Sequence, residues 1–199
     1  HDKTLQLIGR RHSVRDFYNA YELVRKSRIP VVNVDLIIGL PQETEQEIAY
    51  SLEQAVKLAP ENLTVHTLTL KRSAPLFQKQ EQAVLTTQAA EKMVQRAAEM
   101  AAAIGLEPYY LYRQHYMLGH LANIGYAKPG TESIYNIQMM EERHPVIGVG
   151  PASASKVPLP HGHHLHKLNM PKNVAVYGAR LQELAERRRD LFNIEGTDL

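Results

Sequence analysis

Residues Val31 to Thr44, which read Val-Val-Asn-Val-Asp-Leu-Ile-Ile-Gly-Leu-Pro-Gln-Glu-Thr, decide the fold of this chain. A nearly continuous run of apolar, β-branched residues is typical of a parallel strand that is buried on both faces. The run carries one acidic residue, Asp35, and ends in a Gly-Leu-Pro turn. A buried carboxylate requires a partner, and in α/β folds ligands lie at the carboxyl ends of the strands. The segment therefore predicts a strand that leads into an active-site loop.

Length and composition indicate one sizeable core without disulfides. The chain has 199 residues, of which 44% are hydrophobic and 22% are charged, and it has no cysteine. A net charge of +2 is too small to indicate a nucleic-acid partner. The sequence has no apolar run near the roughly 20 residues of a membrane helix and no signal-peptide pattern. We therefore expect no membrane association and a cytoplasmic location.

Helix and strand patterns alternate around this segment. Apolar residues at helical spacing predict helices that begin at Ser13 and Thr44 and a long helix over Thr87–Ile104. Two further runs, Leu63–Leu70 and Glu107–Tyr112, predict strands. Repeated helix–strand units indicate parallel strands joined by right-handed crossovers, as in a (β/α) barrel or part of one.

Beyond Arg113 the pattern becomes less regular. Glycines punctuate a predicted loop over residues 119–130, a short strand is predicted at Leu165–Asn169, and Asn173–Phe192 is predicted to form one amphipathic helix. The fold class that we expect is α/β, with a partial parallel (β/α) barrel over residues 1–112 and an α+β region over residues 113–199.

Several motifs occur in order along the chain. They are Ile8–Ser13, Asn33–Thr44, Asn62–Ser73, and Tyr110–Gln114 with Asn123–Gly130. In this order and spacing they resemble the radical S-adenosylmethionine (SAM) enzymes of the oxygen-independent coproporphyrinogen III oxidase type, also called coproporphyrinogen dehydrogenases. The resemblance implies the carboxyl-terminal half of a radical SAM barrel, followed by a region that closes over the active site.

The resemblance also implies two cofactors, SAM and a 4Fe-4S cluster. Such enzymes hold the cluster with a Cys-x3-Cys-x2-Cys loop on an earlier strand, and this chain has no cysteine. We therefore expect the cluster ligands upstream of His1 and a fragment that is silent by itself, with self-association through an exposed sheet edge as one consequence. The implied reaction of the intact protein is the oxidative decarboxylation of coproporphyrinogen III to protoporphyrinogen IX in heme biosynthesis, with a tetrapyrrole substrate and an electron-donor protein.

Four residues are implied to contact SAM. Arg10 suits the methionyl carboxylate because its guanidinium is a planar fork of donors, and Asp35 suits the ribose hydroxyls or the amino group. Thr69 would present its backbone to the adenine, and Ala154 would contact the cofactor from a glycine-containing loop over residues 148–154. The alternatives are a surface arginine in an ion pair, a structural Asp that binds backbone amides, an ordinary strand threonine and loop packing.

The propionates of the implied substrate call for cations, and Lys71, Arg72 and Arg113 are the candidates because they lie at the ends of predicted strands. Solvated surface charge is the alternative. The histidines of His161–His166 fit no standard metal spacing, so no metal is predicted. His66, inside a strand, is either a proton carrier or a hydrogen-bonded core residue, and we favour the core residue because the sequence names no partner.

Two other classes of function stay open. The first is a related radical SAM or heme-binding and heme-transfer protein with another substrate. The second is a binding fragment without catalytic activity, which would expose an apolar flank.

Overall fold

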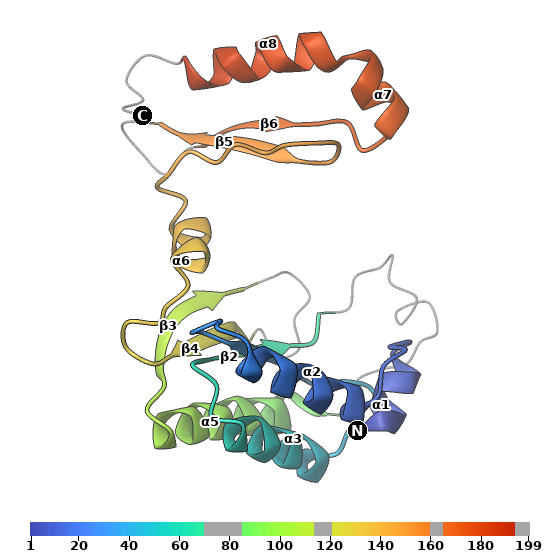
Figure 1. Cartoon of the computed structure of the whole chain (residues 1–199), viewed down its shortest axis with the longest axis vertical. Coiled ribbons are helices and arrows are strands. Elements are labelled where there is room, and N and C mark those ends of the chain that lie inside the picture. The colour runs from blue at the N-terminus through green and yellow to red at the C-terminus, as the bar shows by residue number, and fades with distance from the viewer. Residues whose placement is uncertain (70–84, 114–120, 160–164, 194–199) are drawn as a thin grey trace. The chain divides into compact units, whose positions relative to one another are not determined.

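The computed structural model describes residues 1–69, 85–113, 121–159 and 165–193 (Figure 1). The chain forms two compact units, His1–Ile137 and Gln138–Leu199. The first unit extends beyond residue 112 and also contains strand β4 (Asn123–Ala127).

The first unit is an α/β structure with one four-stranded sheet. In chain order its helices and strands up to β4 are α1 (Asp2–Leu7), α2 (Val14–Lys26), β1 (Asn33–Ile38), α3 (Glu45–Lys57), β2 (Asn62–Thr67), α5 (Thr87–Ala103), β3 (Glu107–Tyr112) and β4. From α2 to β3 they follow the predicted alternation, and α1 and β4 were not predicted. Helix α6 (Ile134–Glu141) follows β4 along the chain.

The predicted helix starts are confirmed. The hydroxyls of Ser13 and Thr44 each accept a hydrogen bond from a backbone amide of the first turn, and Asp16 and Glu47 complete two capping boxes. Such caps satisfy amides that have no partner within the helix. They fix where α2 begins and where α3 begins after the Gly-Leu-Pro turn.

The strand order in the sheet is β1-β2-β4-β3. β1 and β2 are parallel, and β4 is antiparallel to both β2 and β3. Strand β3 therefore runs in the same direction as β1 and β2, as predicted, but it does not lie beside β2. The prediction of a loop over residues 119–130 is wrong for Asn123–Ala127, because these residues form β4, which lies between β2 and β3.

A glycine inside β4 explains why the strand reads as a loop. Gly125 pairs with Tyr110 of β3, and any Cβ at Gly125 would collide with the Tyr110 ring. Glycine is used in a strand where another group approaches the backbone closely. The residue that looks like a turn signal is therefore a packing requirement of the sheet.

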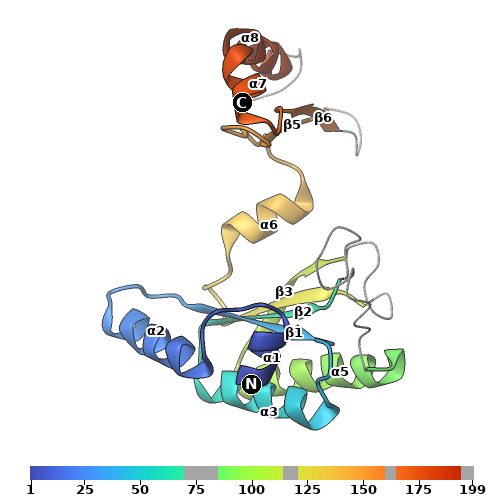
Figure 2. The same cartoon turned by 90° about the vertical axis from the view of Figure 1, so that its right-hand side faces the viewer.

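One face of the sheet carries the core. Helices α3 and α5 lie together against this face (Figure 2), where Val34, Ile38, Leu63 and Val65 are buried. The expectation that β1 is buried on both faces is wrong. Buried and accessible residues alternate along β1, because α3 and α5 cover the face of Val34 and Ile38, whereas the other face carries Asn33, Asp35 and Ile37.

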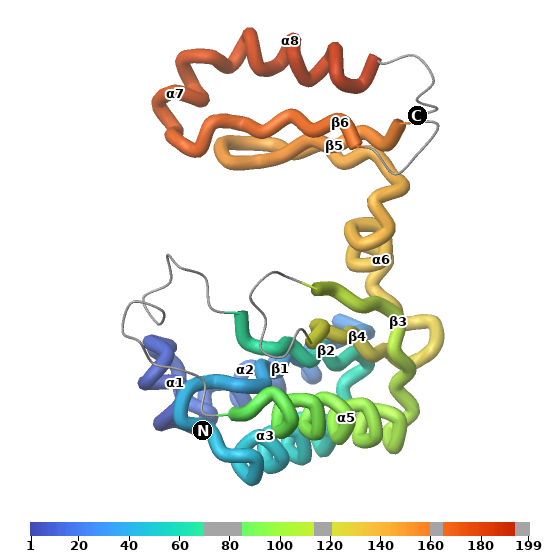
Figure 3. Tube along the Cα trace, turned by 180° about the vertical axis from the view of Figure 1, so that it is seen from behind, coloured from blue at the N-terminus to red at the C-terminus, as the bar shows by residue number. Residues whose placement is uncertain are grey.

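The second unit is an α+β structure. Strands β5 (Ala154–Pro158) and β6 (Leu165–Asn169) form an antiparallel pair, and Leu184 of α8 (Leu181–Phe192) is buried in this unit (Figure 3). The single terminal helix of the sequence analysis is instead two helices, because the backbone leaves the helical conformation at Arg180 after α7 (Val174–Ala179). Across the described ranges, no helix combines the length and apolarity needed to cross a membrane.

Replacing Gly125 by Ala should destabilise the first unit by about 1–3 kcal/mol, because the added methyl group forces the Tyr110 ring out of its place. Chemical denaturation of the parent and the variant measures this cost. The matched control is the same replacement in a Tyr110→Ala background, where the cost should be much smaller. An equal cost in both backgrounds would contradict the packing argument.

Candidate functional site

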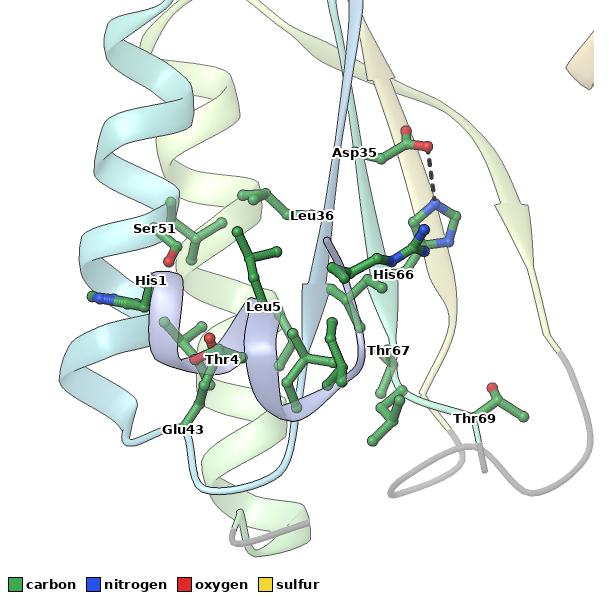
Figure 4. A pocket seen from close by; sticks show the side chains of 18 of the residues that line it. His1, Thr4, Leu5, Asp35, Leu36, Glu43, Ser51, His66, Thr67 and Thr69 are labelled. Atoms are coloured by element: carbon green, nitrogen blue, oxygen red, sulfur yellow. Dashed lines mark ion pairs between the residues drawn. The ribbon is translucent and has the colours of Figure 1, made fainter. Parts of the chain in front are cut away.

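A pocket of about 590 Å³ lies at the carboxyl end of β1 and β2 (Figure 4). Its walls come from α1 and the turn that follows it, from β1 and the Gly-Leu-Pro loop, from the first part of α3, and from the end of β2. The predicted active-site loop contributes Leu40 and Glu43. The pocket therefore occupies the place where α/β folds bind ligands.

Three of the four residues assigned to SAM line this pocket. Arg10 follows α1, Asp35 is on β1, and Thr69 follows β2. The fourth, Ala154, begins β5 in the second unit. Residues that are far apart in the sequence thus meet at one pocket, and their contact with a cofactor stays a prediction.

The residues predicted to bind propionates are not brought together in the described structure. Lys71 and Arg72 lie outside the described residues. Arg113 is exposed after β3 and is not among the residues that line the pocket. Most of the histidine cluster, His161 to His164, is also outside the described residues, and the described part of the chain contains no group of acidic and histidine side chains suited to a metal ion.

Asp35 is held by side chains of its own sheet. Its Oδ1 accepts a hydrogen bond of 2.6 Å from Nδ2 of Asn33, and Oδ1 of Asn33 accepts one of 3.0 Å from the hydroxyl of Thr64. The Asp35 side chain is 59% exposed, so it is not a buried carboxylate. The alternative from the sequence was a structural Asp that binds backbone amides. The described hydrogen bond of Asp35 comes instead from the side chain of Asn33.

His66 gives Asp35 a second partner. Nε2 of His66 lies 3.7 Å from Oδ2 of Asp35, as the dashed line in Figure 4 shows. His66, with a smaller contribution from Asn33, holds the pKa of Asp35 below its usual value, although partial burial acts in the opposite direction. Asp35 is therefore ionised at neutral pH.

The expectation that His66 is a core residue is wrong, because its side chain is 33% exposed and faces the pocket. The parallel register explains the contact. Asp35 pairs with Thr64 and Ile37 pairs with His66, which makes His66 the diagonal neighbour of Asp35 on the same face of the sheet. The sequence contains this information only if the register of β1 against β2 is known.

Two further polar groups at the pocket are buried. Thr67 is 3% exposed, and its hydroxyl has no hydrogen-bond partner within the described residues. Glu43 is 5% exposed, and burial raises the pKa of its carboxyl group, with partial compensation from Thr4. Buried polar groups are normally satisfied, so these two side chains are the polar positions that folding leaves least well solvated at this end of the sheet.

The donors and acceptors at the pocket fit SAM. An ionised carboxylate at Asp35 suits hydroxyl or amino groups, Arg10 suits a carboxylate, and the backbone at Thr69 can bind a base edge. An iron–sulfur cluster does not fit this chain, because clusters are held by cysteine thiolates and the chain has no cysteine.

The fold is that of a radical SAM protein. The structure is similar to that of coproporphyrinogen III oxidase (HemN) from Escherichia coli, which is described as a radical SAM enzyme. The TM-score is 0.65 over 92% of this chain and 41% of that one. The two sequences are 15% identical, so this likeness shows the fold alone.

Curated relatives give the family. The oxygen-independent coproporphyrinogen-III oxidase-like protein HemZ of Bacillus subtilis is 40% identical over 94% of this chain and 38% of that protein. The heme chaperone HemW of Escherichia coli is 25% identical over 81% of this chain and 39% of that protein. No protein-family model matches the chain. The chain belongs to the family of oxygen-independent coproporphyrinogen III oxidase-like radical SAM proteins, as its motifs predict, and it spans less than half the length of these relatives.

Replacing Glu43 by Gln should stabilise the protein at neutral pH. A carboxyl group whose pKa is raised on folding contributes stability below its unfolded pKa, and that contribution is lost as the pH rises through the folded pKa. The stability gained by the variant over the parent should therefore grow between about pH 4 and pH 7.

Thermal or denaturant unfolding across this range measures the effect. Glu45→Gln is the matched control, since Glu45 is exposed on the next turn and its replacement should change stability by less than about 0.5 kcal/mol at any pH. A gain for Glu43→Gln that does not depend on pH would contradict the burial argument.

Proposed function

We propose that the pocket at the carboxyl end of β1 and β2 binds SAM in the whole protein to which this chain belongs. The observation that carries the proposal is the meeting of Arg10, Asp35 and Thr69 at one pocket. Arg10 precedes Asp35 by 25 positions, and Asp35 precedes Thr69 by 34. The parallel pairing of β1 with β2 and the position of α1 at the ends of these strands bring them together.

Each residue has a distinct task in this proposal. The charged Asp35 carboxylate accepts hydrogen bonds from the ribose hydroxyls or the amino group, and Arg10 pairs with the methionyl carboxylate. The backbone beside Thr69 binds the adenine edge, while the contact of Ala154 with the cofactor stays a prediction from the motifs. When bound, the cofactor supplies radical chemistry on the substrate, while the protein orients both molecules and excludes water.

For the whole protein we propose the oxidative decarboxylation of coproporphyrinogen III to protoporphyrinogen IX without molecular oxygen. The names of HemZ and HemN support this reaction. The substrate is then a tetrapyrrole, and a separate protein donates electrons. Lys71, Arg72 and Arg113 are proposed to bind its propionates, because carboxylates are held best by positively charged donors.

A heme-binding or heme-transfer function is the second candidate. Relatives named heme chaperones in Escherichia coli and Haemophilus influenzae agree with this alternative.

Replacing Arg10 by Ala should weaken SAM binding about 10- to 100-fold, which corresponds to the loss of a charge-assisted hydrogen-bonding partner. Calorimetric titration of the whole protein, prepared anaerobically with its cluster reconstituted, measures the affinity. Arg15→Ala is the matched control, because Arg15 is exposed on α2 and does not line the pocket. Equal affinity in the parent and in Arg10→Ala would refute the proposed site.

The same preparation separates the two functions. Conversion of coproporphyrinogen III to protoporphyrinogen IX, detected by chromatography and abolished in Arg10→Ala, would establish the decarboxylase. Stoichiometric heme binding without conversion would establish the heme-handling alternative and overturn the proposed reaction, while SAM binding would still support the pocket.

A further inference from the structure

We propose that His66 is a positioning residue that, with Asn33, holds the Asp35 carboxylate in one orientation for the hydroxyl or amino groups of the bound nucleoside. This inference rests on the proposed function, because it names how the SAM pocket is prepared for its ligand. None of the motif assignments gave His66 such a role.

The two oxygens of Asp35 have different partners. Asn33 donates a 2.6 Å hydrogen bond to Oδ1, and the His66 imidazole lies 3.7 Å from Oδ2. The two partners come from different strands, Asn33 from β1 and His66 from β2. A carboxylate with a partner at each oxygen cannot rotate freely about its last torsion, which is otherwise broad and roughly two-fold.

The partner on β1 is itself fixed. The carbonyl oxygen of the Asn33 amide accepts a 3.0 Å hydrogen bond from the hydroxyl of Thr64, which is 2% exposed. This bond settles which end of the amide faces Asp35, because an amide presents its oxygen at one end and its hydrogens at the other. The orientation of Asp35 is therefore transmitted from a buried position in β2.

Stability does not account for this arrangement. The side chains of His66 and Asp35 are 33% and 59% exposed, and ion pairs open to water contribute little to folding. Both side chains nevertheless line the same pocket, and free lone pairs of the carboxylate remain for a ligand. A group that is oriented before its ligand arrives loses less freedom on binding, which increases affinity.

His66 also lowers the pKa of Asp35, which favours the ionised carboxylate that the proposed hydrogen bonds require. Other titratable groups face the same pocket and contribute to its charge. They are His1, Arg10, His12 and Glu43. On β3, burial and, to a smaller extent, the charge of Asp35 raise the pKa of Tyr110. A test must therefore isolate His66 from these groups.

The experiment compares His66→Phe and His66→Gln in the whole, cluster-reconstituted protein, with SAM affinity measured by calorimetry from about pH 3, below the ordinary pKa of an Asp, to about pH 8. His66→Phe removes the imidazole that lies 3.7 Å from Oδ2 of Asp35 and should weaken binding roughly tenfold, because the carboxylate must then be ordered when the ligand binds. His66→Gln retains a donor and should stay within about threefold of the parent. The acidic limb of the affinity profile should move to higher pH in His66→Phe, because Asp35 then titrates closer to its usual pKa.

Two controls make the test specific. In an Asp35→Asn background, His66→Phe should have no further effect if it acts through Asp35. His144→Phe changes an exposed histidine of the second unit and should leave affinity unchanged. Melting temperatures of all variants show whether the fold is retained.

Equal affinity and an unchanged acidic limb in His66→Phe, with the parent still binding SAM, would overturn the positioning role alone. The role would also be overturned if His66→Gln lowered the affinity for SAM as much as His66→Phe does. The same holds if His66→Phe lowered that affinity as much in the Asp35→Asn background as it does when Asp35 is present. Absence of SAM binding in the parent would instead overturn the proposed function on which the inference rests.

Discussion

The parallel pairing of β1 with β2 is the interaction on which the rest of the site depends. It ends both strands at the same edge of the sheet, so that the Gly-Leu-Pro loop and Thr69 lie at one pocket. Its register also places Thr64 beside Asp35 and His66 on the diagonal. A shift of one residue would turn these side chains toward the helices and bury a charged group in the core.

Much of the first unit could be predicted from local patterns. Ser13 and Thr44 indicate where their helices begin, because a hydroxyl just before apolar residues at helical spacing accepts a hydrogen bond from a backbone amide of the first turn. β4 could not be predicted in this way. Gly125 carries the usual signal of a turn, and its true role depends on the Tyr110 ring from another strand. A tertiary contact of this kind leaves no trace in a local pattern.

In the candidate site, too, some features could be predicted from local patterns and others depend on tertiary structure. The motifs named Arg10, Asp35 and Thr69, and the structure places all three at one pocket. His66 was assigned to the core because a single strand does not reveal which residue lies across from it, and the exposed face of β1 was missed because its sequence does not reveal which face α3 and α5 cover. Motifs therefore indicate which residues matter, whereas register indicates how they act together.

A crystal structure of the whole protein with SAM bound tests the central claim most directly. The account predicts the nucleoside in the pocket between α1 and the ends of β1 and β2, with a ribose hydroxyl or the amino group within hydrogen-bond distance of Asp35 and the adenine edge on the backbone beside Thr69. Density for the cofactor at another place, with no contact to Asp35 or Arg10, would contradict it.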